Sequence, residues 1–202
     1  MKSASKIFWN WFTNSYQAYE QLDSIKVNAR EELLNDFERE LHTYCNKLYF
    51  EIGGLPGQSN ELIITAEGDT NYFEQVDQLI DDAPITPNWI FIAFKPPMPG
   101  HFKTKWGNIE LDTQDIYFNP SNGSDSSGIG IIMYLKKYDD RYEDDYYNAL
   151  FKMLDTVLGE KSFALDIKNV VIKLNEGQIA EDDMLPLLKL PAYIKWYKSK
   201  RV

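Results

Sequence analysis

The apolar residues between Glu61 and Leu174 switch repeatedly between two spacings, and this pattern strongly limits the folds open to the chain. Some segments carry consecutive or β-branched apolar residues, as strands do, whereas others repeat them every three or four positions, as helices do. The strand-like segments are 61–66, 88–95, 129–136 and 170–174. Helix-like segments follow the first and the third of these strands. The order predicts an α+β protein.

That order is βαββαβ, which matches the ferredoxin-like plait. In such a plait the first and third strands are central and both helices cover one face of the sheet. Segments 61–66 and 129–136 would then be the central strands. The segment 88–95 is equally apolar and predicts burial on both faces of that strand. Short strands near 109–111 and 116–118 would be additions to the plait.

Further elements flank this core. The residues before it predict two N-terminal helices, over 5–22 and from Asn28 to Leu48, and a strand over 48–52 that can form a hairpin with 61–66. A helix is expected over 191–200. Neither an internal repeat nor a linker long enough to divide the chain is evident in the sequence. We therefore expect a single α+β domain over residues 1–202.

The charge of the chain excludes one large class of function. It has 21 basic and 31 acidic residues, a net charge of −10. Nucleic-acid affinity depends on Lys and Arg neutralising phosphates, so a general nucleic-acid binder is not expected. An acidic surface favours solubility or a basic protein partner.

The sequence also predicts where the protein works. Cys45 is the only cysteine, so no intramolecular disulfide can form and a reducing compartment is expected. Its longest strongly apolar run, 89–94, is far shorter than the roughly 18 residues of a membrane-spanning helix. No signal peptide is evident. We expect a soluble, cytoplasmic protein with no membrane partner.

Motifs for catalysis, metal binding or cofactor binding are not found. The chain has two histidines, His42 and His101, and no metal-ligand spacing connects them to Cys45. No nucleophile elbow, phosphate-binding loop or dinucleotide fingerprint occurs. The expectation is no metal, no cofactor and no assigned catalytic residue.

One candidate polar cluster follows from topology. In a plait the first two strands run parallel, so their carboxyl ends meet at one edge of the sheet. This would bring Glu67 and Asp69 toward Lys95 and His101. Such a set could carry out acid–base chemistry if burial separated the pKa values of its members. The alternative is an acidic turn that caps a helix, together with a solvated salt bridge.

Aromatic residues suggest a second candidate. Four of them, Phe8, Trp9, Trp11 and Phe12, lie within five positions of the first helix. They span more of the helix than one narrow stripe can bury. Trp9 lies off the main apolar stripe, so it could face a protein partner or the second copy of a homodimer. Packing against a neighbouring element is the alternative.

One stretch resembles an uncharacterised family of small bacterial proteins. It consists of Glu61-Leu-Ile-Ile-Thr-Ala-Glu-Gly, then Phe73, Val76 and Leu79, then Ala83-Pro84, Trp89 and Ala93-Phe94-Lys95-Pro96. The resemblance covers roughly residues 30 to 118. It implies a bacterial origin and carries over no catalytic residue.

Three hypotheses for function follow from these features. The sequence favours a non-catalytic intracellular protein-interaction or regulatory domain. One alternative is an immunity-like inhibitor that neutralises a basic partner by charge complementarity. The other is a small-molecule enzyme that uses the cluster of Glu67, Asp69, Lys95 and His101.

Overall fold

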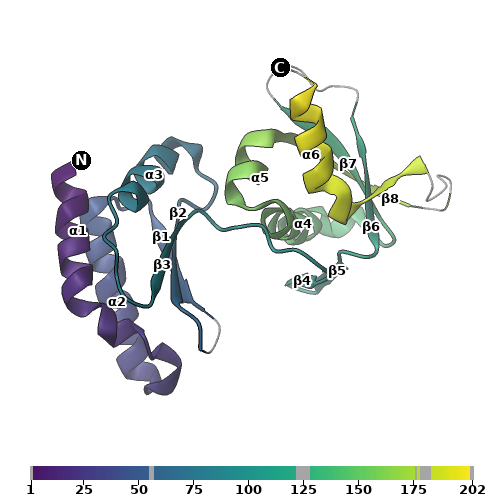
Figure 1. Cartoon of the computed structure of the whole chain (residues 1–202). Coiled ribbons are helices and arrows are strands. Elements are labelled where there is room, and N and C mark those ends of the chain that lie inside the picture. The colour runs from purple at the N-terminus through teal and green to yellow at the C-terminus, as the bar shows by residue number, and fades with distance from the viewer. Residues whose placement is uncertain (1, 55–56, 122–127, 176, 178–182, 201–202) are drawn as a thin grey trace. The chain divides into compact units, whose positions relative to one another are not determined.

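The fold is α+β (Figure 1). The structure, a computed structural model, describes residues 2–54, 57–121, 128–175, 177 and 183–200. The chain divides into two compact units, Met1–Lys95 and Pro96–Val202. Compactness does not test whether the units fold independently, so the single domain over 1–202 stays a prediction.

The first unit is a three-stranded sheet with helices on one face. Its helices are α1 (Lys2–Ser15), α2 (Val27–Tyr44) and α3 (Phe73–Asp81), and its strands are β1 (Tyr49–Gly53), β2 (Asn60–Thr65) and β3 (Trp89–Ala93). The sheet order is β1-β2-β3. Strands β1 and β2 are antiparallel, which confirms the predicted hairpin, and β2 and β3 are parallel.

Aromatic side chains fill the space between the helices and this sheet. Phe12 of α1 is fully buried, and its ring centroid lies 5.2 Å from that of Trp89 on β3. Phe37 of α2 lies 4.1 Å from Phe50 on β1. Each contact joins residues far apart in sequence, so burial of these rings ties both N-terminal helices to the sheet.

The second unit contains a small hairpin and a larger four-stranded sheet. The hairpin consists of β4 (Lys103–Trp106) and β5 (Ile109–Asp112), and the sheet has the order β8-β7-β6-β9. Its strands are β6 (Ile116–Pro120), β7 (Ile129–Leu135), β8 (Ile167–Leu174) and β9 (Leu185–Pro186). The helices are α4 (Glu143–Leu158), α5 (Glu160–Asp166) and α6 (Leu190–Ser199).

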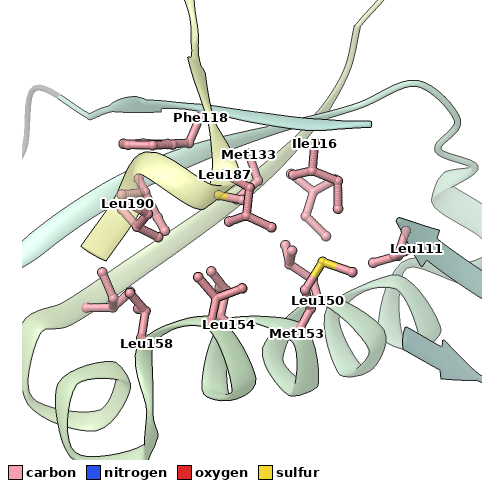
Figure 2. Packing of buried hydrophobic residues seen from close by; sticks show 14 of the residues in the cluster. Leu111, Ile116, Phe118, Met133, Leu150, Met153, Leu154, Leu158, Leu187 and Leu190 are labelled. Carbon is pink, nitrogen blue, oxygen red and sulfur yellow. The ribbon is translucent and has the colours of Figure 1, made fainter. Parts of the chain in front are cut away.

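Helix α4 supplies much of the core of this unit. In Figure 2 its residues Leu150 and Leu154 point toward Met133 of β7 and Phe118 of β6. All four side chains are fully buried. Six of the seven residues of β7 are buried, on both faces of the strand, which explains why its sequence is a strongly apolar run.

Both units contain the same strand–strand–helix–strand arrangement. In each, the first two strands form an antiparallel hairpin, and a helical connection leads to a third strand parallel to the second: β1-β2-α3-β3 and β6-β7-α4-α5-β8. The middle strand by sequence is also the middle of the three in space. The second unit adds the β4–β5 hairpin, α5, β9 and α6.

The helical connections also begin alike. At the same distance beyond the middle strand, the carboxylates of Asp69 and Asp139 each accept a hydrogen bond of 3.1 Å from the backbone N–H two residues later. A short 3₁₀ helix follows each of them, Thr70–Tyr72 and Asp140–Tyr142. The structure thus has an internal repeat of topology that the sequence does not reveal.

The predicted ferredoxin-like plait is not confirmed. It requires the strands predicted at 61–66 and 129–136 to be central in one sheet, but β2 and β7 lie in different sheets. The physical reason is that β1 pairs with one edge of β2 and β3 with the other. No hydrogen-bonding edge of β2 is left for β7.

Two tyrosines of the first unit predict a loss of stability at high pH. Burial raises the pKa of Tyr19 to about 12, with the charge of Asp36 adding to the effect. Burial also raises the pKa of Tyr44 to about 12, and the hydroxyl of Tyr44 donates to the carbonyl of Gln75 at 3.0 Å. An unfolded tyrosine ionises near pH 10. Between about pH 10 and 12 the unfolded state therefore loses protons that the folded state keeps, and folding weakens.

We expect each tyrosine to cost about 1 to 2 kcal/mol of unfolding free energy over that interval. Urea unfolding followed by circular dichroism at pH 8, 10 and 11.5 measures it. Between pH 8 and 11.5, the unfolding free energy of Tyr19→Phe and of Tyr44→Phe should fall less than that of the wild type. Equal declines in all three proteins would contradict the prediction.

Candidate functional site

The carboxyl edge of the first sheet holds two of the four residues of the candidate polar cluster. Strands β2 and β3 are parallel, so the residues that follow them meet at one edge. There the Nζ of Lys95 donates to Oε2 of Glu67 at 2.9 Å. The side chain of Glu67 is 52% exposed and that of Lys95 is 21% exposed. The two residues form a solvated ion pair.

The backbone on both sides of this ion pair is in the left-handed region. Glu67 has φ 51° and Phe94 has φ 66°, although neither is glycine. Each such residue costs about 1 to 2 kcal/mol. Local hydrogen bonds hold both: Glu67 N–H donates to Oγ1 of Thr65 at 2.9 Å, and Phe94 N–H donates to the carbonyl of Ile64 at 2.8 Å. These bonds direct the ends of both strands into the turns that carry the ion pair.

The other two residues of the cluster have different surroundings. Oδ1 of Asp69 accepts from both the backbone N–H and the side-chain amide of Asn71, at 3.1 and 2.8 Å. Its carboxylate therefore starts the 3₁₀ helix before α3. His101 belongs to the second unit, where it is exposed in the segment before β4. Within the first unit the geometry matches the alternative of a capping turn and a solvated salt bridge.

Trp9, the candidate interaction residue, is 3% exposed. Its indole Nε1 donates to the carbonyl of Leu79 on α3 at 2.7 Å, and its ring lies 4.6 Å from that of Phe91 on β3. A helix that buries residues on several sides uses more than one stripe, and α1 does so because it contacts both α3 and the sheet. Trp9 packs against neighbouring elements, as the alternative interpretation expected.

A face of the first sheet presents a different kind of surface. Side chains alternate along strands, and the helices contact the face that carries Phe50 and Phe91. The opposite face, here called the open face, is formed by Glu51 of β1, Glu61 and Ile63 of β2, and Ile90 and Ile92 of β3. No helix in the described part of this unit packs on it.

The open face has an acidic side and an apolar side. Glu51 lies opposite Ile63, which lies opposite Ile92, and in the next row Glu61 lies opposite Ile90. Ile90 is 48% exposed, whereas Ile63 and Ile92 are half-buried. The expectation that 88–95 is buried on both faces is therefore wrong for β3. Within the first unit, the apolar outer residues of β3 belong to a surface and not to a second core layer.

A cavity of about 430 Å³ lies within the second unit. It is lined by the β4–β5 hairpin, the start of β6, the end of β7 and Tyr146 of α4. Its position at the end of β7 corresponds topologically to the position of Glu67 after β2. The sequence analysis missed this site. The pair Lys136-Lys137, which directly follows the strand IGIIMYL, could have indicated a charged site at the end of that strand.

The residues that the structure describes contain no group of three or more His, Cys, Asp or Glu side chains placed to hold a metal ion. None of the helices among them combines the length and the apolar character needed to span a membrane.

Comparison of the chain with models of protein families, with curated proteins and with solved structures found no match.

Proposed function

We propose that the chain is a non-catalytic intracellular protein-interaction or regulatory domain, and that the open face of the first sheet binds its partner. The observation that carries the proposal is Ile90, which is 48% exposed beside the half-buried Ile63 and Ile92. Apolar side chains gathered on one sheet face, with charges along one side, are typical of interaction surfaces.

The charges of the open face suggest the chemistry of the partner. Glu51 of β1 and Glu61 of the central strand β2 are the acidic residues of the open face, and the whole chain carries a net charge of −10. A partner with an apolar contact patch flanked by Lys or Arg would match this surface. The overall charge would speed the encounter with a basic partner, and the rate would fall as salt is added.

The immunity-like alternative uses the same surface. In that case the basic partner is a toxin or an enzyme, and binding abolishes its activity. The enzyme alternative receives less support, because Asp69 caps a 3₁₀ helix and Glu67 pairs with Lys95 in a solvated ion pair. An interaction domain needs neither residue to react.

Site-specific crosslinking tests the proposal. Ile90 is replaced by the photo-crosslinking residue p-benzoylphenylalanine in the cells that make the protein. We expect a crosslink to one basic protein, because the residue lies on the exposed side of the open face. Ile85, which is fully exposed but lies outside this face, gives the matched control position.

The partner is then purified and its affinity is measured by calorimetry. Ile90→Lys should weaken binding at least about tenfold, since it places a charge in an apolar contact. Ile85→Lys should bind like the wild type. Equal affinity of Ile90→Lys and Ile85→Lys would contradict the proposal. Loss of the partner's own activity on binding would identify the immunity-like version.

A further inference from the structure

The cavity of the second unit has the size and construction of a small-molecule site. Its volume of about 430 Å³ falls within the range of ligand pockets, roughly 300 to 1,000 Å³. Its floor is formed by Leu111, Ile116 and Leu135, which are at most 6% exposed and belong to the main core of this unit. A floor made from the core keeps its shape when a ligand binds, so little energy is lost in ordering it.

Charged side chains of both signs line the walls. They are Lys103, Lys136 and Lys137, with Glu110, Asp112 and Asp115. Two internal ion pairs neutralise most of them: Nζ of Lys103 lies 3.1 Å from Oε1 of Glu110, and Nζ of Lys136 lies 2.7 Å from Oδ1 of Asp115. Each pair carries no net charge, which leaves two of the six charged side chains outside these pairs.

The remaining two are Lys137 and Asp112. Lys137 forms neither an ion pair nor a side-chain hydrogen bond with any residue that the structure describes. Oδ2 of Asp112 lies 4.0 Å from Nζ of Lys103, at the limit of an ion pair, whereas Oδ1 accepts from the backbone N–H of Gln114 at 2.9 Å. The cavity therefore offers one ammonium group and one carboxylate oxygen.

We propose that this cavity binds a small zwitterion of the size of an amino acid, with its anionic group at Lys137 and its ammonium group at Asp112. A ligand with one charge would leave either Lys137 or Asp112 unmatched, whereas a zwitterion pairs with both. The apolar floor then covers the carbon atoms of the ligand. The site lies in the second unit and does not depend on the open face of the first.

The test uses three simple compounds at equal ionic strength: L-alanine, propionate and ethylammonium. Alanine carries both charges, and each of the others carries one. Backbone amide shifts of isotopically labelled full-length protein are followed by nuclear magnetic resonance. We expect saturable shifts at Asp112, Leu135 and Lys137 with millimolar alanine, and at least about threefold weaker binding of either singly charged compound. Equal binding of propionate and alanine would overturn the zwitterion and leave a simple anion site.

Variants locate the site. Lys137→Met and Asp112→Asn should each weaken alanine binding at least about threefold, and the Asn side chain keeps an oxygen for the Gln114 N–H. Lys105→Met is the matched control, because Lys105 is exposed on β4 and does not line the cavity. The proposal fails if Lys137→Met binds alanine as the wild type does, or if no shift at these residues saturates.

Discussion

Replacing Trp9 by Ala should lower the unfolding free energy by about 3 to 5 kcal/mol. Trp9 is 3% exposed, so the substitution leaves a large cavity between α1, α3 and β3. It also removes the indole N–H that donates to the carbonyl of Leu79 at 2.7 Å. Urea unfolding followed by circular dichroism measures the loss.

Ile7→Ala is the matched control for this prediction. Ile7 lies on the same helix but is 57% exposed, so its truncation should change stability by no more than about 0.5 kcal/mol. A change of less than about 1 kcal/mol in Trp9→Ala would contradict the packing role. If such a variant also lost a partner or a dimer contact, the interpretation of Trp9 as an interaction residue would be supported instead.

The same curves test the prediction of a single domain. The first unit contains Trp9 and the second has its own core around α4. If residues 1–202 unfold as one domain, Trp9→Ala shifts one transition that includes both units. Two unfolding transitions, of which Trp9→Ala shifts only one, would contradict the prediction of a single domain.

Local pattern was sufficient to predict most individual elements. Segments 61–66 and 129–136 were predicted as strands and correspond to Asn60–Thr65 and Ile129–Leu135. Spacing along the chain is a local property, and a sequence contains it directly. The predicted first helix, 5–22, is longer than α1, which ends at Ser15 and is followed by the 3₁₀ helix Tyr16–Tyr19.

Partners of strands could not be predicted in the same way. The sequence indicated that β1 could pair with β2, but not that this hairpin and β3 would occupy both edges of β2. Short elements with mixed composition were also missed. Strand β4, KTKW, has no run of apolar residues that would indicate a strand, because three of its four residues are exposed and only Thr104 is buried.

For the candidate sites, too, some features could be predicted from the sequence and others could not. The meeting of Glu67 and Lys95 follows from two adjacent parallel strands, so topology predicted it correctly. The open face could not be predicted, since an apolar strand such as WIFIA reads as buried whether a second layer covers it or not. The cavity lined by Lys103 and Lys137 brings together residues from separate strands. Neither the composition of the chain nor the spacing of its residues indicates that these residues lie close together.

Gly159 lies at the junction of α4 and α5, where a substitution should have a large effect. Helix α4 ends at Leu158, so Gly159 takes the position after a helix end that glycine favours. Gly159 has φ 75° and ψ 152°, a conformation almost restricted to glycine. Its N–H donates to the carbonyl of Asp155, and its own carbonyl accepts from Phe163, so it joins α4 to α5. We expect Gly159→Ala to lower the unfolding free energy by about 2 to 3 kcal/mol.

Gly107→Ala separates this effect from the ordinary cost of a positive φ. Gly107 has φ 55° in the common left-handed region, and an added Cβ would lie 3.8 Å from Oδ2 of Asp145, an ordinary contact. Its substitution should therefore cost only about 1 kcal/mol. Urea unfolding of both variants measures the difference. Equal losses would mean that the α4–α5 junction tolerates a side chain, and that the helix pair is held by its core contacts and not by the backbone of Gly159.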